Sequence, residues 1–78
     1  MKELIKYIAQ ALVDDPEEVS VEEIKAQQTV VLELRVAKED LGKVIGKHGR
    51  TAQALRTLLT AVSAKAGQTR STLDIIDR

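Results

Sequence analysis

Apolar side chains recur at helical spacing in three separate segments of the chain. The first covers residues 3–13 and ends at Asp14-Asp15-Pro16, because the residue before a proline is disfavoured in the helical region. The second is a short segment over residues 38–45. The third, over residues 50–66, has the clearest pattern and precedes Gly67, which stands where a C-cap glycine belongs. The stripe predicted for this last helix consists of Leu55, Leu58, Leu59, Val62 and Ala66.

Alternating apolar and polar residues predict three strands. Residues 29–36 give the strongest pattern. Residues 19–26 are a weaker candidate because Glu22-Glu23 disturbs the alternation, and Gln27-Gln28 supplies the turn between these two strands. Residues 71–77 form the last predicted strand, with Leu73 and Ile75 on one face. On the strongest strand, Val30, Leu32, Leu34 and Val36 share one face, opposite Val31, Glu33 and Arg35.

The predicted order of elements is α-β-β-α-α-β. Three strands and three helices suit an α+β sandwich in which the helices pack on one face of a three-stranded sheet. The 78 residues are enough for a single domain, residues 1–78, and we find no internal repeat, low-complexity tract or linker. A domain of this size buries only about 60–65% of the surface that its unfolded chain exposes, so we expect a thin core.

Charge is segregated along the chain although its formal net value is zero. Residues 1–40 contain ten acidic and five basic residues, whereas residues 41–73 contain six basic residues and no acidic one. This division can give an otherwise acidic domain one basic face that orients it toward a polyanion. Alternatively, the basic residues form a chance cluster on a helix surface exposed to solvent. The six basic residues are Lys43, Lys47, Arg50, Arg56, Lys65 and Arg70. We expect Lys65 and Arg70 to be solvated.

The run Val44-Ile45-Gly46-Lys47-His48-Gly49-Arg50 lies between the two later helices. Glycine has no Cβ, so the backbone at such a position can approach a ligand closely. Lys47 supplies positive charge, and Arg50 opens a helix whose free N–H groups favour an anion. Glycine positions without a Cβ, cations and a helix N-terminus together indicate a loop that binds the phosphates of a nucleic acid.

Several kinds of chemistry have little support. There is no cysteine and only one histidine, so we expect neither a disulfide nor a self-contained metal site, and no cofactor. A phosphate-binding NTPase loop is excluded, because only three residues separate Gly42 from Gly46 and His48 stands where Ser or Thr is required. No carboxylate pair adjoins the loop, so an enzyme is not expected. No apolar run reaches the ~20 residues of a membrane span, and a cytoplasmic location is the default expectation.

The loop and its context resemble a known family. A G-x-x-G loop formed by Gly46-Lys47-His48-Gly49, preceded by Val44-Ile45 and set between two helices, is similar to that of the KH RNA-binding domain. One helix and one strand lead into a β-α-α-β core, residues 29–77, and this order resembles the type II arrangement. Nearly the whole chain is covered, and the length and charge look most like the small bacterial single-KH proteins of the KhpA type.

The resemblance implies a set of RNA-binding residues. The loop, residues 46–49, would hold phosphates, and Val44 and Ile45 would help to wall an apolar groove for the bases. Part of the strand over residues 29–36 would form the opposite wall, with Arg35 as its candidate. Basic residues would extend the rim of the site. The full implied set is Gly46, Lys47, His48, Gly49, Val44, Ile45, Lys43, Arg50, Arg56 and Arg35.

The resemblance also implies partners and a role. The partner is single-stranded RNA, with a homodimer or a complex with a multidomain KhpB-type protein as the working unit. The role is post-transcriptional regulation or RNA chaperoning, linked to cell-envelope growth and cell shape. The chain has a single aromatic residue, Tyr7 on the first predicted helix. This is consistent with the family, because RRM and OB-fold modules stack bases on several aromatic side chains and this chain has only one.

Two alternatives stay open. The first is a helix-turn-helix DNA binder over residues 38–66, with Arg50, Gln53 and Arg56 on the recognition helix. The second is an assembly module in which the KH fold serves as a protein-docking surface and nucleic-acid binding is incidental. Comparing the affinity of the protein for duplex DNA with its affinity for unpaired RNA distinguishes the first alternative from RNA binding. A loop variant that still binds its protein partner would support the second alternative.

Overall fold

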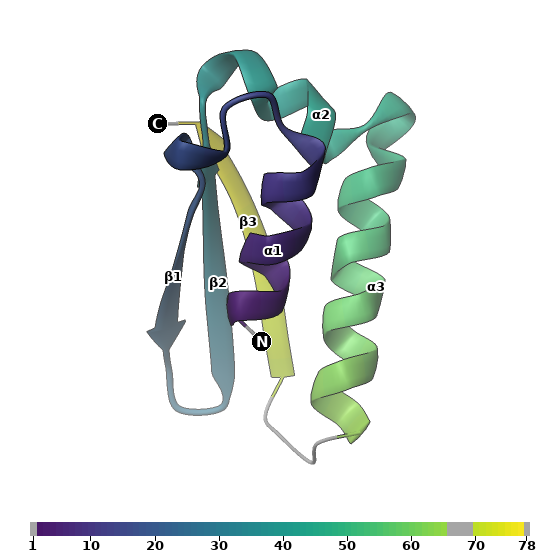
Figure 1. Cartoon of the computed structure of the whole chain (residues 1–78). Helices are drawn as coiled ribbons and strands as arrows, with labels where there is room; N and C mark the ends of the chain where they lie inside the picture. Colours follow the sequence, from purple (N-terminus) through teal and green to yellow (C-terminus); the bar gives the residue numbers. More distant parts are fainter. Residues whose placement is uncertain (1, 66–69, 78) are drawn as a thin grey trace.

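The computed structural model describes residues 2–65 and 70–77, which form one three-stranded sheet with helices on one of its faces (Figure 1). The order α-β-β-α-α-β and the α+β class predicted from the sequence are confirmed. Short 3-10 turns link several of the elements. In chain order the elements are α1 (Lys2–Leu12), η1 (Pro16–Glu18), β1 (Ser20–Lys25), β2 (Thr29–Val36), η2 (Lys38–Asp40), α2 (Leu41–Ile45), η3 (Lys47–Gly49), α3 (Arg50–Lys65) and β3 (Arg70–Asp77).

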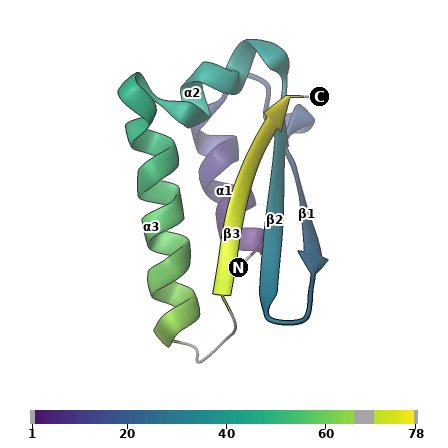
Figure 2. The ribbon, with the colours of Figure 1, turned by 180° about the vertical axis from the view of Figure 1, so that it is seen from behind.

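The sheet has the order β1-β2-β3 and mixes two kinds of pairing. Strands β1 and β2 are antiparallel and meet in a tight turn, where the Ala26 N–H donates to the Thr29 carbonyl at 2.8 Å. Strands β2 and β3 are parallel, so the chain must cross over between them, and α2 and α3 provide that crossover. The crossover leaves β3 at a sheet edge beside α3, as the view from behind shows (Figure 2).

The core lies between the sheet and the helices. Leu32, Leu34 and Val36 on β2 are fully buried, as the alternating pattern of that strand predicts. Ile5 of α1 and Leu59 of α3 meet them from the helical layer. The remaining members of the buried cluster are Ala9, Val19, Val21, Val44, Leu55 and Leu73. The opposite face of the sheet carries no helix (Figure 1).

Three expectations for the later helices differ from the structure or fall outside it. Residues 38–45 form a 3-10 turn followed by a five-residue helix rather than one helix. Leu58 is 37% exposed, and Ala52 is buried in its place, because the buried stripe of α3 follows the side that faces β3 and α1. The predicted contribution of Ala66 and the predicted C-cap at Gly67 lie outside the described residues.

Asp40 is a buried carboxylate that ties α2 to the segment after α1. It is 2% exposed and accepts the backbone N–H of Asp14 at 3.3 Å and of Asp15 at 3.0 Å. These two N–H groups lie beyond the end of α1, outside its hydrogen-bond ladder, and the carboxylate satisfies both of them. Asp40 therefore fixes where α2, and with it the glycine loop, sits against the rest of the domain.

Candidate nucleic-acid interface

The glycine loop between α2 and α3 has an unusual backbone. Gly46 and Gly49 have φ values of 78° and 73°, and His48 has a φ of 58°. Positive φ is open to glycine but rare for other residues, among which histidine is one of the more tolerant. The Gly49 N–H donates to the Gly46 carbonyl at 3.1 Å, which closes the loop into a single tight turn. The two glycines that the sequence singled out are therefore required by the conformation of this turn.

Gly46 has a second reason to be glycine. A Cβ built on it would lie 2.7 Å from the Cβ of Thr51 and 2.8 Å from the Thr51 backbone nitrogen. Such distances are not tolerated between non-bonded atoms. Gly49, by contrast, has nothing within 4 Å of the same position. The loop thus packs on the first turn of α3 at Gly46 and presents bare backbone to the surroundings at Gly49.

The polar side chains in and beside the loop are open to solvent. Lys47 and Arg50 are exposed, so their positive charge is available to a ligand, and the His48 side chain is exposed between them. They stand at the beginning of α3, a helix of 16 residues with no acidic residue in its first turn. The positive end of a helix dipole and adjoining cations favour the same ligand, an anion. The structure therefore brings together the four loop residues and Arg50 as predicted.

The other predicted residues of this region lie in different surroundings. Val44 is fully buried and offers no surface, so Ile45, which is half-buried, is the member of that pair with side-chain area to present. Lys43 lies between carboxylates, with its Nζ 3.2 Å from Asp14 Oδ2 and 4.0 Å from Asp40 Oδ1. Its charge is therefore already offset within the protein.

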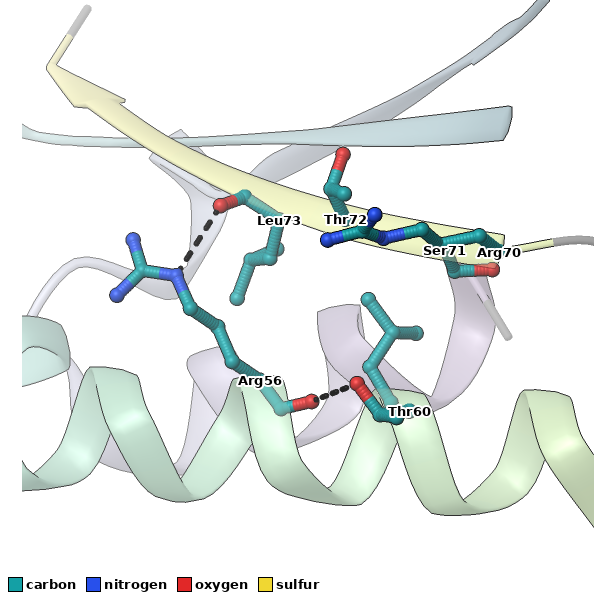
Figure 3. A pocket seen from close by; sticks show the side chains of 7 residues that line it. Arg56, Thr60, Arg70, Ser71, Thr72 and Leu73 are labelled. Atoms are coloured by element: carbon teal, nitrogen blue, oxygen red, sulfur yellow. Dashed lines mark hydrogen bonds between the residues drawn. The ribbon is translucent and has the colours of Figure 1, made fainter. Parts of the chain in front are cut away.

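A hollow of about 270 Å³ opens between α3 and β3 (Figure 3). Arg56, Leu59 and Thr60 line it from α3, and residues 70–73 line it from β3. Its apolar part is the edge of the core, since Leu59 and Leu73 are 1% and 3% exposed. Arg56 lies two turns beyond the loop, about 9 Å along the helix axis from Arg50. The two leucines therefore offer almost no side-chain surface to a ligand, and the rim of the hollow is polar and basic.

The wall facing α3 is β3, whereas the sequence assigned this role to part of residues 29–36. Arg35 lies on the helix-free face of the sheet, since its neighbours Leu34 and Val36 point into the core. There its Nη2 donates to Glu33 Oε1 at 3.3 Å. The structure therefore does not bring Arg35 together with the loop. The physical reason is strand order: the parallel crossover places β3, rather than β2, beside α3.

The helix-free face of the sheet is acidic. Glu22 of β1 is opposite Glu33 of β2, and Glu33 is in turn opposite Asp74 of β3. This row of carboxylates across the sheet opposes binding of a polyanion there. The charge division seen along the sequence thus becomes a division in space, with the cations at the loop, α3 and the start of β3.

Two groups of functional candidates were not found from the sequence. Arg70, expected to be solvated, lines the hollow together with three hydroxyl-bearing residues, Thr60, Ser71 and Thr72. Arg70 belongs to the acid-free stretch, so its charge was a usable signal. The hydroxyls carried none, because only the packing of α3 beside β3 brings them together. Within this pairing the Ser63 hydroxyl donates to the Ser71 hydroxyl at 2.9 Å.

Metal-binding clusters and membrane-spanning helices are both absent from the described parts of the chain. Over residues 2–65 and 70–77, no three His, Asp or Glu side chains are grouped so that they could hold a metal ion. In the same residues, none of the helices combines the length and the apolar character needed to cross a membrane.

Comparison with known proteins gives one consistent result. The family described as KhpA/KhpB, KH domain, matches residues 2–75. Among the similar proteins is the RNA-binding protein KhpA of Treponema pallidum, 63% identical over 76 residues, which cover 97% of this chain and 94% of that protein. The RNA-binding protein KhpA of Caldanaerobacter subterraneus subsp. tengcongensis is 58% identical over 65 residues, covering 83% and 87%.

A more distant relative covers the chain almost completely. The RNA-binding protein KhpA of Chlamydia pneumoniae is 48% identical over 77 residues, which cover 99% of this chain and 97% of that protein. No solved structure matches. The match of the family over nearly the whole chain agrees with the order of elements and with the G-x-x-G loop between α2 and α3. The chain belongs to the KhpA/KhpB family of KH domains.

Proposed function

We propose that this protein binds single-stranded RNA, holding the phosphate backbone on the loop at residues 46–49 and bases in the hollow between α3 and β3. The observation that carries the proposal is the loop itself. Bare glycine backbone, the exposed side chains of Lys47 and His48 and the N-terminus of α3 converge on one spot. The relatives named above as RNA-binding proteins support the same conclusion.

The hollow supplies what the loop lacks. Phosphate contacts position a nucleic acid, whereas base contacts distinguish one sequence from another. Single-stranded RNA can turn its unstacked bases toward a protein surface, and the hollow beside β3 lies further along α3, the helix that begins at the loop. A duplex keeps its bases stacked, so it does not use such a hollow.

A single module of this kind clamps about four nucleotides, so its affinity for RNA is low. Linking two modules raises the effective concentration and therefore the overall affinity. This favours a homodimer, or a complex with a KhpB-type multidomain protein, as the working unit. The role we propose is that of a cytoplasmic post-transcriptional regulator or RNA chaperone, with effects on cell shape and the cell wall.

The helix-turn-helix alternative requires a recognition helix that is free to enter a groove of DNA. Here α3 lies along β3, and Arg56, one of its three expected base-reading residues, donates a hydrogen bond to that strand. The assembly alternative requires no nucleic acid at all. The assembly alternative also gives no role to the exposed cations of the glycine loop.

The test compares single-stranded RNA with duplex DNA of equal length, each fluorescently labelled and titrated with the full chain. We expect measurable, salt-sensitive binding of the RNA and weaker binding of the duplex. Preference for the duplex would support the helix-turn-helix alternative. If the chain bound neither nucleic acid but captured a KhpB-type protein, the assembly alternative would replace the proposal.

A further inference from the structure

Arg56 is tethered across the hollow between α3 and β3. Its Nε donates to the backbone carbonyl of Leu73 at 3.3 Å (Figure 3). The tether uses one of the five N–H donors of the guanidinium. The terminal nitrogens are not in that bond, and they point away from Thr60, Ser71 and Arg70, toward the end of α3 at which the glycine loop lies (Figure 3). Within the described part of the chain, no carboxylate forms an ion pair with them.

The carbonyl that holds Arg56 is available because β3 is an edge strand. Strand β3 pairs with β2 on one side only, so the groups on its other edge are not used by the sheet. The backbone of Leu73 is held in place by that pairing and by its side chain, which is 3% exposed in the core. The acceptor is therefore rigid, and a rigid acceptor fixes the plane of the guanidinium.

We propose that Arg56 is a specificity-determining residue, whose tethered guanidinium selects guanine at the nucleotide position beside the glycine loop; this inference rests on the proposed function. A planar guanidinium with two free parallel donors matches a pair of acceptors in one plane. Guanine presents such a pair, O6 and N7, and arginine bound to both is the commonest base-specific contact known for DNA. In unpaired RNA this edge of the base is equally accessible.

The surroundings of Arg56 favour a base over a phosphate as its partner. Phosphate is provided for elsewhere, at the loop and the N-terminus of α3. The tether also sets the guanidinium in one orientation, which discriminates between bases but adds little to the attraction of a phosphate, whose oxygens accept from many directions.

The experiment measures the affinity of the full chain for short labelled uridine-rich RNAs that differ at one central base. We expect the guanine RNA to bind more tightly than the adenine, cytosine and uridine RNAs, by about five-fold to 150-fold, the range of one good two-bond contact. Inosine keeps O6 and N7 and should keep the preference. 7-Deazaguanine lacks N7 and should lose it.

Two matched variants assign the preference to Arg56. Arg56→Lys keeps the positive charge but removes the planar pair of donors, so the preference for guanine should disappear while binding of the other RNAs changes little. Arg35→Lys makes the same replacement on the helix-free face of the sheet, outside the hollow and away from the loop, and should leave the preference intact. A thermal melt of each variant shows that it is folded.

Other outcomes overturn the inference in distinguishable ways. Equal binding of all the RNAs by the native chain would contradict the role of Arg56 and leave the proposed function standing. A uniform loss of affinity in Arg56→Lys, with the preference retained, would mean that Arg56 contacts phosphate. Absence of binding to every RNA would contradict the proposed function itself.

Discussion

Gly46 packs so closely on Thr51 that a side chain at Gly46 has no room: an added Cβ would lie 2.7 Å from the Thr51 Cβ. The φ of Gly46 is also positive, at 78° with a ψ of 170°, a region that is essentially reserved for glycine. Gly49 shares the positive φ but has free space around it. The two glycines of one motif are thus required for different physical reasons.

Replacing each glycine by alanine should therefore have different costs. Gly49→Ala meets only the conformational penalty and should lower the free energy of unfolding by about 1–2 kcal/mol. Gly46→Ala adds a clash with Thr51 to a comparable penalty and should cost about 3 kcal/mol or more. Urea unfolding of both variants measures the difference. Equal losses would mean that the loop relaxes away from α3 without cost.

The buried carboxylate of Asp40 provides a second test. Asp40→Ala removes the acceptor of the Asp14 and Asp15 N–H groups, which follow α1 in a part-buried region. We expect a loss of about 2–3 kcal/mol in the free energy of unfolding, because hydrogen bonds to a charged group are stronger than neutral ones. Glu39→Ala is the matched control, an exposed acidic neighbour whose removal should cost less than about 0.5 kcal/mol. A small effect at both positions would show that solvent satisfies the two N–H groups.

Local patterns explain how far the sequence alone could go. The alternation of apolar residues gave the bounds of β2, and the glycine spacing located the turn between α2 and α3, because both depend on neighbouring residues. Strand order depends on the crossover of the whole chain, so Arg35 was assigned to a wall that β3 provides. The tether from Arg56 to Leu73 joins residues 17 positions apart and leaves no local trace.

Lys43 and Lys47 offer a comparison of two lysines in adjacent elements. The ammonium of Lys43 lies beside Asp14 and Asp40, whereas Lys47 is exposed in the loop. A phosphate gains less from a cation that is already paired, so Lys47→Gln should weaken RNA binding more than Lys43→Gln. Lys47→Gln should also reduce the slope of RNA affinity against salt concentration by the amount expected for about one phosphate contact. The measurement is a titration of labelled single-stranded RNA at several salt concentrations. A larger effect at Lys43 would mean that its ion pairs open when RNA binds.

We propose that the glycine loop binds the phosphates of RNA, and one double variant tests this directly. Lys47→Asp/His48→Asp places two carboxylates on exposed positions, and aspartate tolerates the left-handed conformation of His48. The fold should therefore be retained, which a thermal melt checks. Lys6→Glu/Gln10→Glu is the matched control, because it changes the net charge equally on α1, which lies behind the hollow in Figure 3.

The measurement is fluorescence anisotropy of labelled single-stranded RNA with the native chain, the loop variant and the control variant, at low and at moderate salt. We expect the loop variant to lose at least about ten-fold in affinity, since like charges brought together at an interface cost several kcal/mol. The control should lose far less, and the native chain should bind more weakly as salt rises. Unchanged RNA binding by a folded loop variant would contradict the account.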